Sequence, residues 1–458
     1  MLFHNWIFLL FFAIVYPVYL VVKGTRFRSL WLLIASYVFY GWWNPLYLLL
    51  IAYSTSVDYL VVSAMSRWGR RPLWLCLSIA NNLSLLGFFK YGKFITNNLN
   101  ALLSRLGVAW AIPMPDILFP VGLSFFMFES MSYTIDFFRG HIERERSFIR
   151  YAAFVSLFPQ LLAGPIERAR NLLPQLQREP RIARQDVADG LSLFVVGLFK
   201  KVALADYLAT YVNEVYAVPD LYSSSALMLA TFAYAWQIYF DFSGYTDMAR
   251  GVARVMGFDL MLNFNNPYLA TGLGEFWQRW HISLSTWFKD YVYISLGGNR
   301  KGEIRTYVNM FLTMVISGLW HGAQWTFVLW GVFHALGRVA TRELERSRFY
   351  RERVPRCVKQ AYVFVFVCFC WIFFRAETLT DAWTIVTRIA AGGVSDPACP
   401  LLMLVLIASV WLYQFIYESR ARRVLEMRPV RIGLIVAMIM YVAVFATSSS
   451  EAFIYFQF

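Results

Sequence analysis

Long stretches of this 458-residue chain contain no Asp, Glu, Lys or Arg, and they constrain its fold more than any other feature. The stretches cover residues 5–22, 29–57, 72–89, 151–166, 221–240, 306–337, 360–374, 397–417 and 432–450. A helix needs about 20 apolar residues to cross a bilayer. Charged types make up only 15% of the chain, whereas a soluble domain carries roughly 25%. We predict an all-α polytopic membrane protein, one domain over 1–458, with roughly 10–12 membrane helices, some short or re-entrant.

The positive charges indicate how the chain is oriented in the membrane. Lys and Arg number 42 against 28 Asp and Glu, which gives a net charge of +14. They gather in short clusters between the apolar runs, at 23–28, 67–71, 338–356 and 418–431. Such clusters are typical of cytoplasmic loops and not of a nucleic-acid-binding face. We therefore expect contact with membrane lipid, no nucleic acid partner, and both termini on the extracytoplasmic side of the cell inner membrane.

Helix-breaking residues inside the runs refine where the helices are expected to begin and end. The run 29–57 is too long for one span, and Gly41-Trp42-Trp43-Asn44-Pro45 interrupts it, which predicts a helical hairpin. Residues 1–22 lack Lys and Arg, so 5–22 is expected to be a retained span and not a cleaved signal.

The five cysteines show no zinc-ligand spacing, and neither a metal site nor a permanently bound cofactor is expected.

The first candidate site is a tryptophan-rich segment around His281. Read as one helix over 275–291, it carries an apolar face at i, i+3, i+4 spacing, which predicts an in-plane or shallowly re-entrant helix at the cytoplasmic side of the membrane. That face consists of Trp277, Trp280, Leu284, Trp287 and Tyr291. His281 borders the face. It is either a functional group or a packing histidine bonded to a carbonyl.

The second candidate is His321, in Ser317-Gly318-Leu319-Trp320-His321-Gly322-Ala323. Basic clusters flank the uncharged run 306–337 on both sides, so the run is expected to enter the membrane and return. A histidine at that depth is usually functional, and the glycines around it allow close approach of another backbone. We predict that His321 lies at the narrowest point of a passage open to both membrane faces, although a helix-packing histidine is the alternative. His334, nearer the basic end of the run, is expected at the membrane interface.

Together with several other motifs, these two segments resemble the membrane-bound O-acyltransferase (MBOAT) family. The motifs are Trp280-His281-Ile282-Ser283-Leu284-Ser285, Gly318-Leu319-Trp320-His321-Gly322, Phe119-Pro120-Val121-Gly122-Leu123-Ser124, Phe158-Pro159-Gln160-Leu161-Leu162-Ala163-Gly164-Pro165, Asp241-Phe242-Ser243-Gly244-Tyr245, Asn263-Phe264-Asn265-Asn266-Pro267-Tyr268 and Leu296-Gly297-Gly298-Asn299-Arg300. They are most similar to the bacterial branch that contains alginate O-acetyltransferase. The resemblance extends from Trp42 to the last residue.

The resemblance implies a central tunnel and an O-acetyltransferase activity. A family member moves an acyl group from a cytoplasmic thioester, here acetyl-CoA, to an acceptor outside. A lipase-like extracytoplasmic acetyltransferase then modifies a polysaccharide such as alginate, cellulose or peptidoglycan. His321 matches the family's essential histidine and His281 its second polar position, while Trp280, Trp320 and Asn266 are candidates for the tunnel wall. The alternatives are a D-alanyl transferase fed by a carrier protein, and a non-catalytic conduit or transporter.

The C-terminal residues Phe453-Ile454-Tyr455-Phe456-Gln457-Phe458 are too apolar to extend into water. They are either an interfacial aromatic anchor or a tail that turns back towards His321. The ending is similar to that of partner peptides and subunits around the family, in which the tyrosine is proposed to accept the acyl group. Tyr455 is therefore a candidate acyl relay, because a phenol is a better leaving group than a sugar alkoxide.

Overall fold

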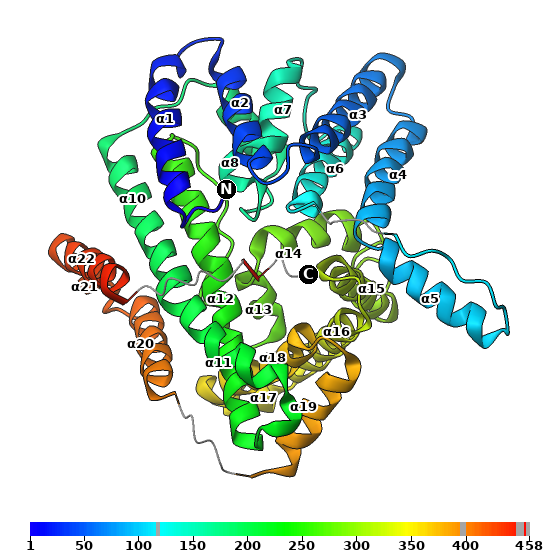
Figure 1. Ribbon diagram of the computed structural model, residues 1–458, viewed down its shortest axis with the longest axis vertical. Coiled ribbons are helices and arrows are strands. Elements are labelled where there is room, and N and C mark those ends of the chain that lie inside the picture. Colours follow the sequence, from blue (N-terminus) through cyan, green and yellow to red (C-terminus); the bar gives the residue numbers. More distant parts are fainter. Residues whose placement is uncertain (116–119, 394–399, 446–452, 455–458) are drawn as a thin grey trace. The chain divides into compact units, whose positions relative to one another are not determined.

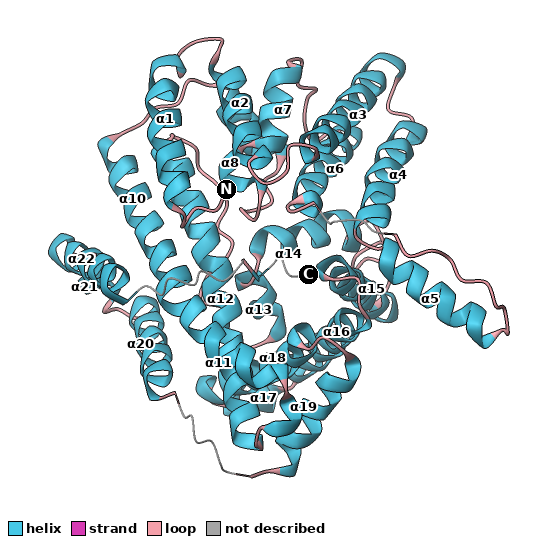
Figure 2. Ribbon diagram, viewed as in Figure 1, coloured by secondary structure: helices cyan, strands magenta, loops and turns pink. Residues whose placement is uncertain are grey.

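The computed structural model describes residues 1–115, 120–393, 400–445 and 453–454. Across these residues the secondary structure is helical, with helices joined by loops and without strands (Figure 2). The chain forms two compact units, each described here by itself (Figure 1). The first comprises 1–190 and 252–261, and the second comprises 191–251 and 262–458.

The first unit is built mainly from the N-terminal helices. They are α1 (Trp6–Val22), α2 (Arg28–Gly41), α3 (Tyr47–Trp68), α4 (Pro72–Phe89), α5 (Gly92–Arg105), α6 (Leu123–Arg139), α7 (Phe148–Ser156), α8 (Phe158–Leu161) and α9 (Ala169–Gln177). The break between α2 and α3 confirms the hairpin expected at Gly41–Pro45. Inside this unit the buried Asp58 of α3 accepts hydrogen bonds from Ser78 and Asn82 of α4 and from Ser130 of α6. These bonds satisfy a carboxylate that would otherwise be costly among apolar side chains.

The second unit contains the segments that carry both candidate histidines. Helix α10 (Arg184–Leu198) begins in the first unit and continues into the second. The elements that follow it are the π-helix η1 (Phe199–Ala205), α11 (Asp206–Ala217), η2 (Pro219–Leu221), α12 (Ser224–Val255), η3 (Pro267–Leu269), α13 (Leu273–Arg279), α14 (Ile282–Phe288), η4 (Lys289–Tyr293), α15 (Glu303–His321), α16 (Trp325–Arg346), α17 (Arg348–Arg353), α18 (Arg356–Arg375), α19 (Leu379–Ala391), α20 (Leu401–Glu418), α21 (Arg422–Leu425) and α22 (Arg428–Phe445).

Among the described residues, five helices are long and apolar enough to cross a membrane: α3, α4, α18, α20 and α22. Helix α1 is also apolar but has only 17 residues. Much of α4, α20 and α22 is not buried by protein, as expected of helices whose apolar side chains face lipid. The prediction of an all-α polytopic membrane protein with some short helices is confirmed.

The uncharged run 306–337 forms the hairpin of α15 and α16. The helices begin and end in the flanking charged residues, so each has about 20 residues although the run itself is short. A Cβ on Gly318 would lie 2.3 Å from the carbonyl oxygen of Phe327, and one on Gly331 would lie 2.5 Å from that of Met314. Glycine is therefore required at both positions, because real Cβ atoms do not approach so closely. The close backbone approach expected at Gly318 is confirmed.

The run 151–166 forms the nine-residue α7 and the four-residue α8, which the non-helical backbone of Leu157 separates. One expectation about local structure is wrong, because the segment 275–291 is not one helix. It breaks between α13 and α14 at His281, whose backbone is left-handed with φ of 42°. The aromatic periodicity nevertheless identified a buried face, since Trp280, Leu284, Trp287 and Tyr291 are all core residues.

Candidate active site

His321 is the last residue of α15 and is enclosed by aromatic side chains. Its ring lies 4.9 Å from Trp320, 5.0 Å from Trp330 and 5.2 Å from Phe374, measured between centroids. The residue is only 4% exposed. The rings come from α15, α16 and α18, so three helices fix the position of one imidazole. An imidazole in its neutral form can accept a proton from a hydroxyl group.

His281 is held by a hydrogen bond at the break between α13 and α14. Its Nδ1 lies 3.0 Å from Oδ1 of Asn263, which also accepts bonds from the main-chain N–H and the hydroxyl of Ser283. Because a main-chain N–H can only donate, the Asn263 atom at this point is the oxygen, and His281 Nδ1 carries the proton. The other ring nitrogen, Nε2, is then the acceptor. Burial lowers the pKa of His281, which lies outside the five candidate spans, to about 3.

Two main-chain bonds place Asn263 beside His281. The N–H of Asn265 donates to the carbonyl of Arg279, and the N–H of Ile282 donates to the carbonyl of Asn263. The loop 263–265 therefore runs along the break between the two short helices. The left-handed backbone of His281 costs free energy, of order 1–3 kcal/mol, and such conformations cluster at functional sites.

Trp320 connects the two histidines, because its ring packs against both. The centroids are 6.3 Å from His281 and 4.9 Å from His321. Trp280 is also buried, but it packs on Phe264, Phe276 and Trp371. The structure thus brings His281, Trp320 and His321 into one cluster, with Trp280 in the adjoining aromatic layer. Their predicted roles and the passage to both membrane faces stay predictions.

Asn266 stays a predicted tunnel-wall residue, and sequence reasoning did not identify Asn263, the asparagine that contacts His281. Asn266 is partly exposed and adopts a left-handed conformation at the start of η3, whereas Asn263, three residues earlier in the same motif, holds His281. No sequence signal separates the two, since the contact depends on how the loop folds back. His334, expected at the membrane interface, is fully buried in the second unit against Trp277 and Trp330.

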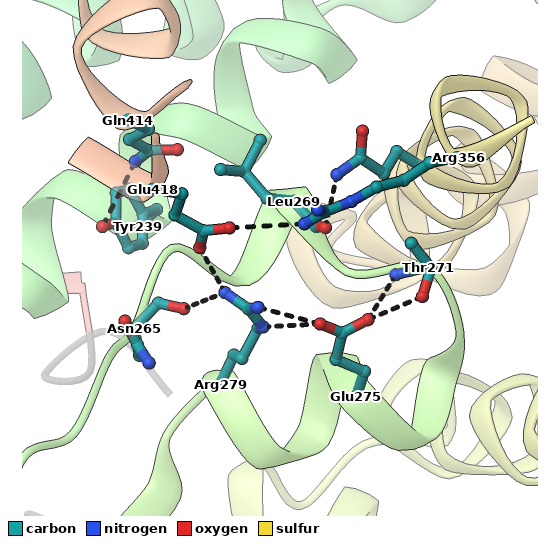
Figure 3. A network of polar contacts seen from close by, with 10 residues as sticks. Tyr239, Asn265, Leu269, Thr271, Glu275, Arg279, Arg356, Gln414 and Glu418 are labelled. Atoms are coloured by element: carbon teal, nitrogen blue, oxygen red, sulfur yellow. Dashed lines mark hydrogen bonds and ion pairs between the residues drawn. The ribbon is translucent and has the colours of Figure 1, made fainter. Parts of the chain in front are cut away.

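An ionic network fixes α13 beside the helices of the same unit (Figure 3). Arg279 bonds to Glu275 one turn earlier and to Glu418 at the end of α20, and Glu418 also pairs with Arg356 of α18. Burial would raise the pKa of Glu275, but hydrogen bonds from Thr271 and the Arg279 guanidinium hold it below its ordinary value. Arg279 directly precedes Trp280 and His281 in sequence, so the network anchors the chain just before these two residues.

The C-terminal segment enters the second unit. Phe453 is 0% and Ile454 3% exposed, and Phe453 packs on Phe242 and Tyr245 of α12. Phe242 in turn packs against His281 at 4.7 Å between centroids. Tyr455 lies outside the described residues, so its role as a relay stays a prediction.

Comparison with known proteins identifies the class. The family model of the membrane-bound O-acyltransferases matches residues 138–380, which include the two histidines, Asn263 and Asp241. The probable alginate O-acetylase AlgI of Pseudomonas aeruginosa is 42% identical over 387 residues, covering 84% of this chain and 74% of that protein. The chain belongs to the membrane-bound O-acyltransferase family and is an acyltransferase.

Two further relatives broaden the comparison. The peptidoglycan O-acetyltransferase of Helicobacter pylori is 35% identical over 406 residues, or 81% of this chain and 76% of that protein. The teichoic acid D-alanyltransferase of Bacillus subtilis is 26% identical over 333 residues, or 67% of this chain and 83% of that protein. Identity is thus higher to these O-acetyl-transferring relatives than to the D-alanyl-transferring one.

Proposed function

We propose that this protein moves acetyl groups from cytoplasmic acetyl-CoA across the inner membrane for O-acetylation of an extracytoplasmic polysaccharide. The observation that carries the proposal is the buried cluster of His281, Trp320 and His321 in a chain 42% identical to an alginate O-acetylase. The higher identity to O-acetylases than to a D-alanyltransferase supports acetyl as the group transferred. Alginate and peptidoglycan, which appear in the names of the relatives, are candidate acceptors, and cellulose is a third.

His321 is the general base in this proposal. Its neutral imidazole takes the proton of an acceptor hydroxyl as the hydroxyl oxygen attacks the thioester carbonyl carbon. The carbon–sulfur bond then breaks, and the proton passes to the leaving CoA thiolate. Positioned general-base catalysis of this kind contributes about 10²–10⁴-fold in rate. His281 positions the donor, with its Nδ1 proton fixed on Asn263 and Nε2 presented as an acceptor.

The Tyr455 hydroxyl is the first acceptor in the proposal, and a lipase-like extracytoplasmic acetyltransferase removes the acetyl group from it. A phenol ester is suited to a relay because phenol, with a pKa of about 10, leaves more readily than a sugar alkoxide. The burial of Phe453 and Ile454 against α12 supports a tail that returns into the protein. The basic clusters support extracytoplasmic termini.

The test is acetyl transfer from radiolabelled acetyl-CoA in vesicles that contain the full chain and its polysaccharide acetyltransferase. We expect His321→Ala to insert normally and to lose at least about 100-fold in transfer. His141→Ala, which changes an exposed histidine, is the matched control and should keep the wild-type rate. Wild-type transfer by His321→Ala would contradict the general-base role and favour a non-catalytic conduit.

The donor is tested separately. Wild-type vesicles are supplied with acetyl-CoA or with an aminoacyl carrier protein, and transfer is expected from acetyl-CoA alone. Transfer from the aminoacyl carrier protein only would overturn the acetyl assignment and identify a D-alanyl transferase.

A further inference from the structure

A buried ionic cluster in the second unit lies outside the histidine site. Lys201 Nζ is 2.7 Å from a carboxylate oxygen of Asp206 and 2.8 Å from Oδ1 of Asp241. All three side chains are at most 4% exposed. Lys201 thus faces two carboxylates, and buried charged groups are stabilised by the hydrogen-bond donors around them.

The C-terminal segment supplies one such donor. The main-chain N–H of Ile454 donates to Oδ2 of Asp241 at 2.7 Å, a separation of 213 residues in sequence. The two oxygens of Asp241 are thus divided, one facing Lys201 and one bonded to the tail. A main-chain N–H bound to a carboxylate is a charge-assisted bond, which is stronger than a neutral one.

The helices around the cluster hold these groups in place. Lys201 lies in the π-helix η1, a conformation found frequently at functional sites. A Cβ on Gly197 would lie 2.5 Å from the carbonyl oxygen of Gly244, and one on Gly244 would lie 2.7 Å from that of Gly197. The two glycines therefore let the backbone before Lys201 approach α12 one turn after Asp241.

The side chain of Phe453 adds specificity to the main-chain bond. Its ring packs 5.6 Å from Phe242 and 4.8 Å from Tyr245, which follow Asp241 by one and four residues in α12. Phe242 also packs against His281. Residues 453–454 are the short red segment beside α12 in Figure 1. The ring of Phe242 contacts both Phe453 and His281, so it links this segment to the histidine cluster.

We propose that Asp241, held by Lys201, is a positioning residue that docks the C-terminal segment through the Ile454 N–H, with Phe242 and Tyr245 receiving Phe453. The consequence for acetyl transfer rests on the proposed function, in which Tyr455 is the acceptor. The docking itself does not depend on that function.

The experiment follows trimming of the full-length protein by a carboxypeptidase, with intact-mass spectrometry as the readout. In the wild type, trimming is expected to pause at Ile454. Asp241→Ala should remove this pause, with trimming past Ile454 at least about tenfold faster, because a hydrogen bond to a charged group is lost. The matched control is Asp206→Ala, which also removes one carboxylate from Lys201 and leaves a neutral pair, while Asp241 keeps the oxygen that accepts from the Ile454 N–H. It should keep the pause.

The outcomes separate docking from relay. A persistent pause in Asp241→Ala, or equal loss of the pause in Asp206→Ala, overturns the docking role. If Asp241→Ala does not accumulate, Phe453→Ala tests the dock from the tail side, and a wild-type pause there also overturns it. If the pause depends on Asp241 while Tyr455→Phe transfers acetyl at the wild-type rate, the dock stands and the relay fails.

Discussion

The two candidate histidines are held in different ways. His321 ends a regular helix, and aromatic rings from three helices enclose it. His281 lies between two seven-residue helices, with a left-handed backbone and a hydrogen bond to Asn263 that fixes its tautomer. Packing fixes where the first imidazole is, whereas hydrogen bonding fixes which nitrogen of the second carries the proton.

In the proposed function the two histidines have different roles. A general base needs a fixed position within reach of the proton that it takes, and packing by three helices provides one for His321. A group that orients a donor needs a defined hydrogen-bonding direction, which the Asn263 contact provides. The two regions should therefore respond differently to substitution, since the first depends on close helix packing and the second on one polar side chain.

The largest expected effect is on the α15–α16 packing behind His321. In Gly318→Ala the new methyl group would lie 2.3 Å from the Phe327 carbonyl oxygen, so the helices must separate. Overpacking of this kind costs about 1–3 kcal/mol or more. We expect a clearly lower Tm and a strong loss of transfer, measured by thermal unfolding in detergent and by the vesicle assay.

Gly433→Ala is the matched control for this substitution. Gly433 is also in a helix, α22, but a Cβ there meets nothing within 4 Å. Alanine has the higher helix propensity, so the Tm of this variant should not fall. An equal loss of Tm in both variants would contradict the packing argument.

The next effect concerns the orientation of His281. Asn263→Ala removes the acceptor of the Nδ1 proton, and a misplaced group in an active site costs up to about 100-fold in rate. We expect transfer to fall tenfold to about 100-fold while the protein still inserts. Asn265→Ala is the control, because Asn265 is exposed and contributes main-chain atoms to the same loop. Wild-type transfer by Asn263→Ala would show that the fixed tautomer is not needed.

Much of this architecture could be predicted because it depends on local composition. The uncharged runs indicated α3, α4, α18, α20 and α22, and the basic flanks of 306–337 indicated a hairpin that enters and returns. His321 was selected because ionisable residues are rare within membrane segments, and the structure places it with Trp320 and His281 in one cluster. The class of protein followed from motifs spread over most of the chain.

The remaining features depend on contacts between residues far apart in sequence. The aromatic periodicity of 275–291 continues unchanged through His281, so it carried no signal for the break. Asn263 and Asn266 lie in one motif, and only the folded loop distinguishes them. Lys201, Asp241 and Ile454 are brought together by tertiary structure alone, which periodicity cannot reveal.

The smallest expected effect is a pH dependence of stability that originates at His281. Burial lowers its pKa to about 3, whereas an unfolded histidine titrates near 6.5. Below about pH 6.5 the unfolded state therefore binds more protons than the folded state, and the free energy of unfolding falls as the pH is lowered towards 3. His281→Gln removes this titration and keeps a side chain that can donate to Asn263. The Tm advantage of the wild type over His281→Gln should accordingly shrink between about pH 7.5 and pH 5. Asn265→Ala changes no titratable group, so its Tm difference from the wild type should stay constant over that range. A difference between wild type and His281→Gln that is equally constant would mean that His281 is not held neutral by burial, and the contrast drawn between the two histidines would then rest on geometry alone.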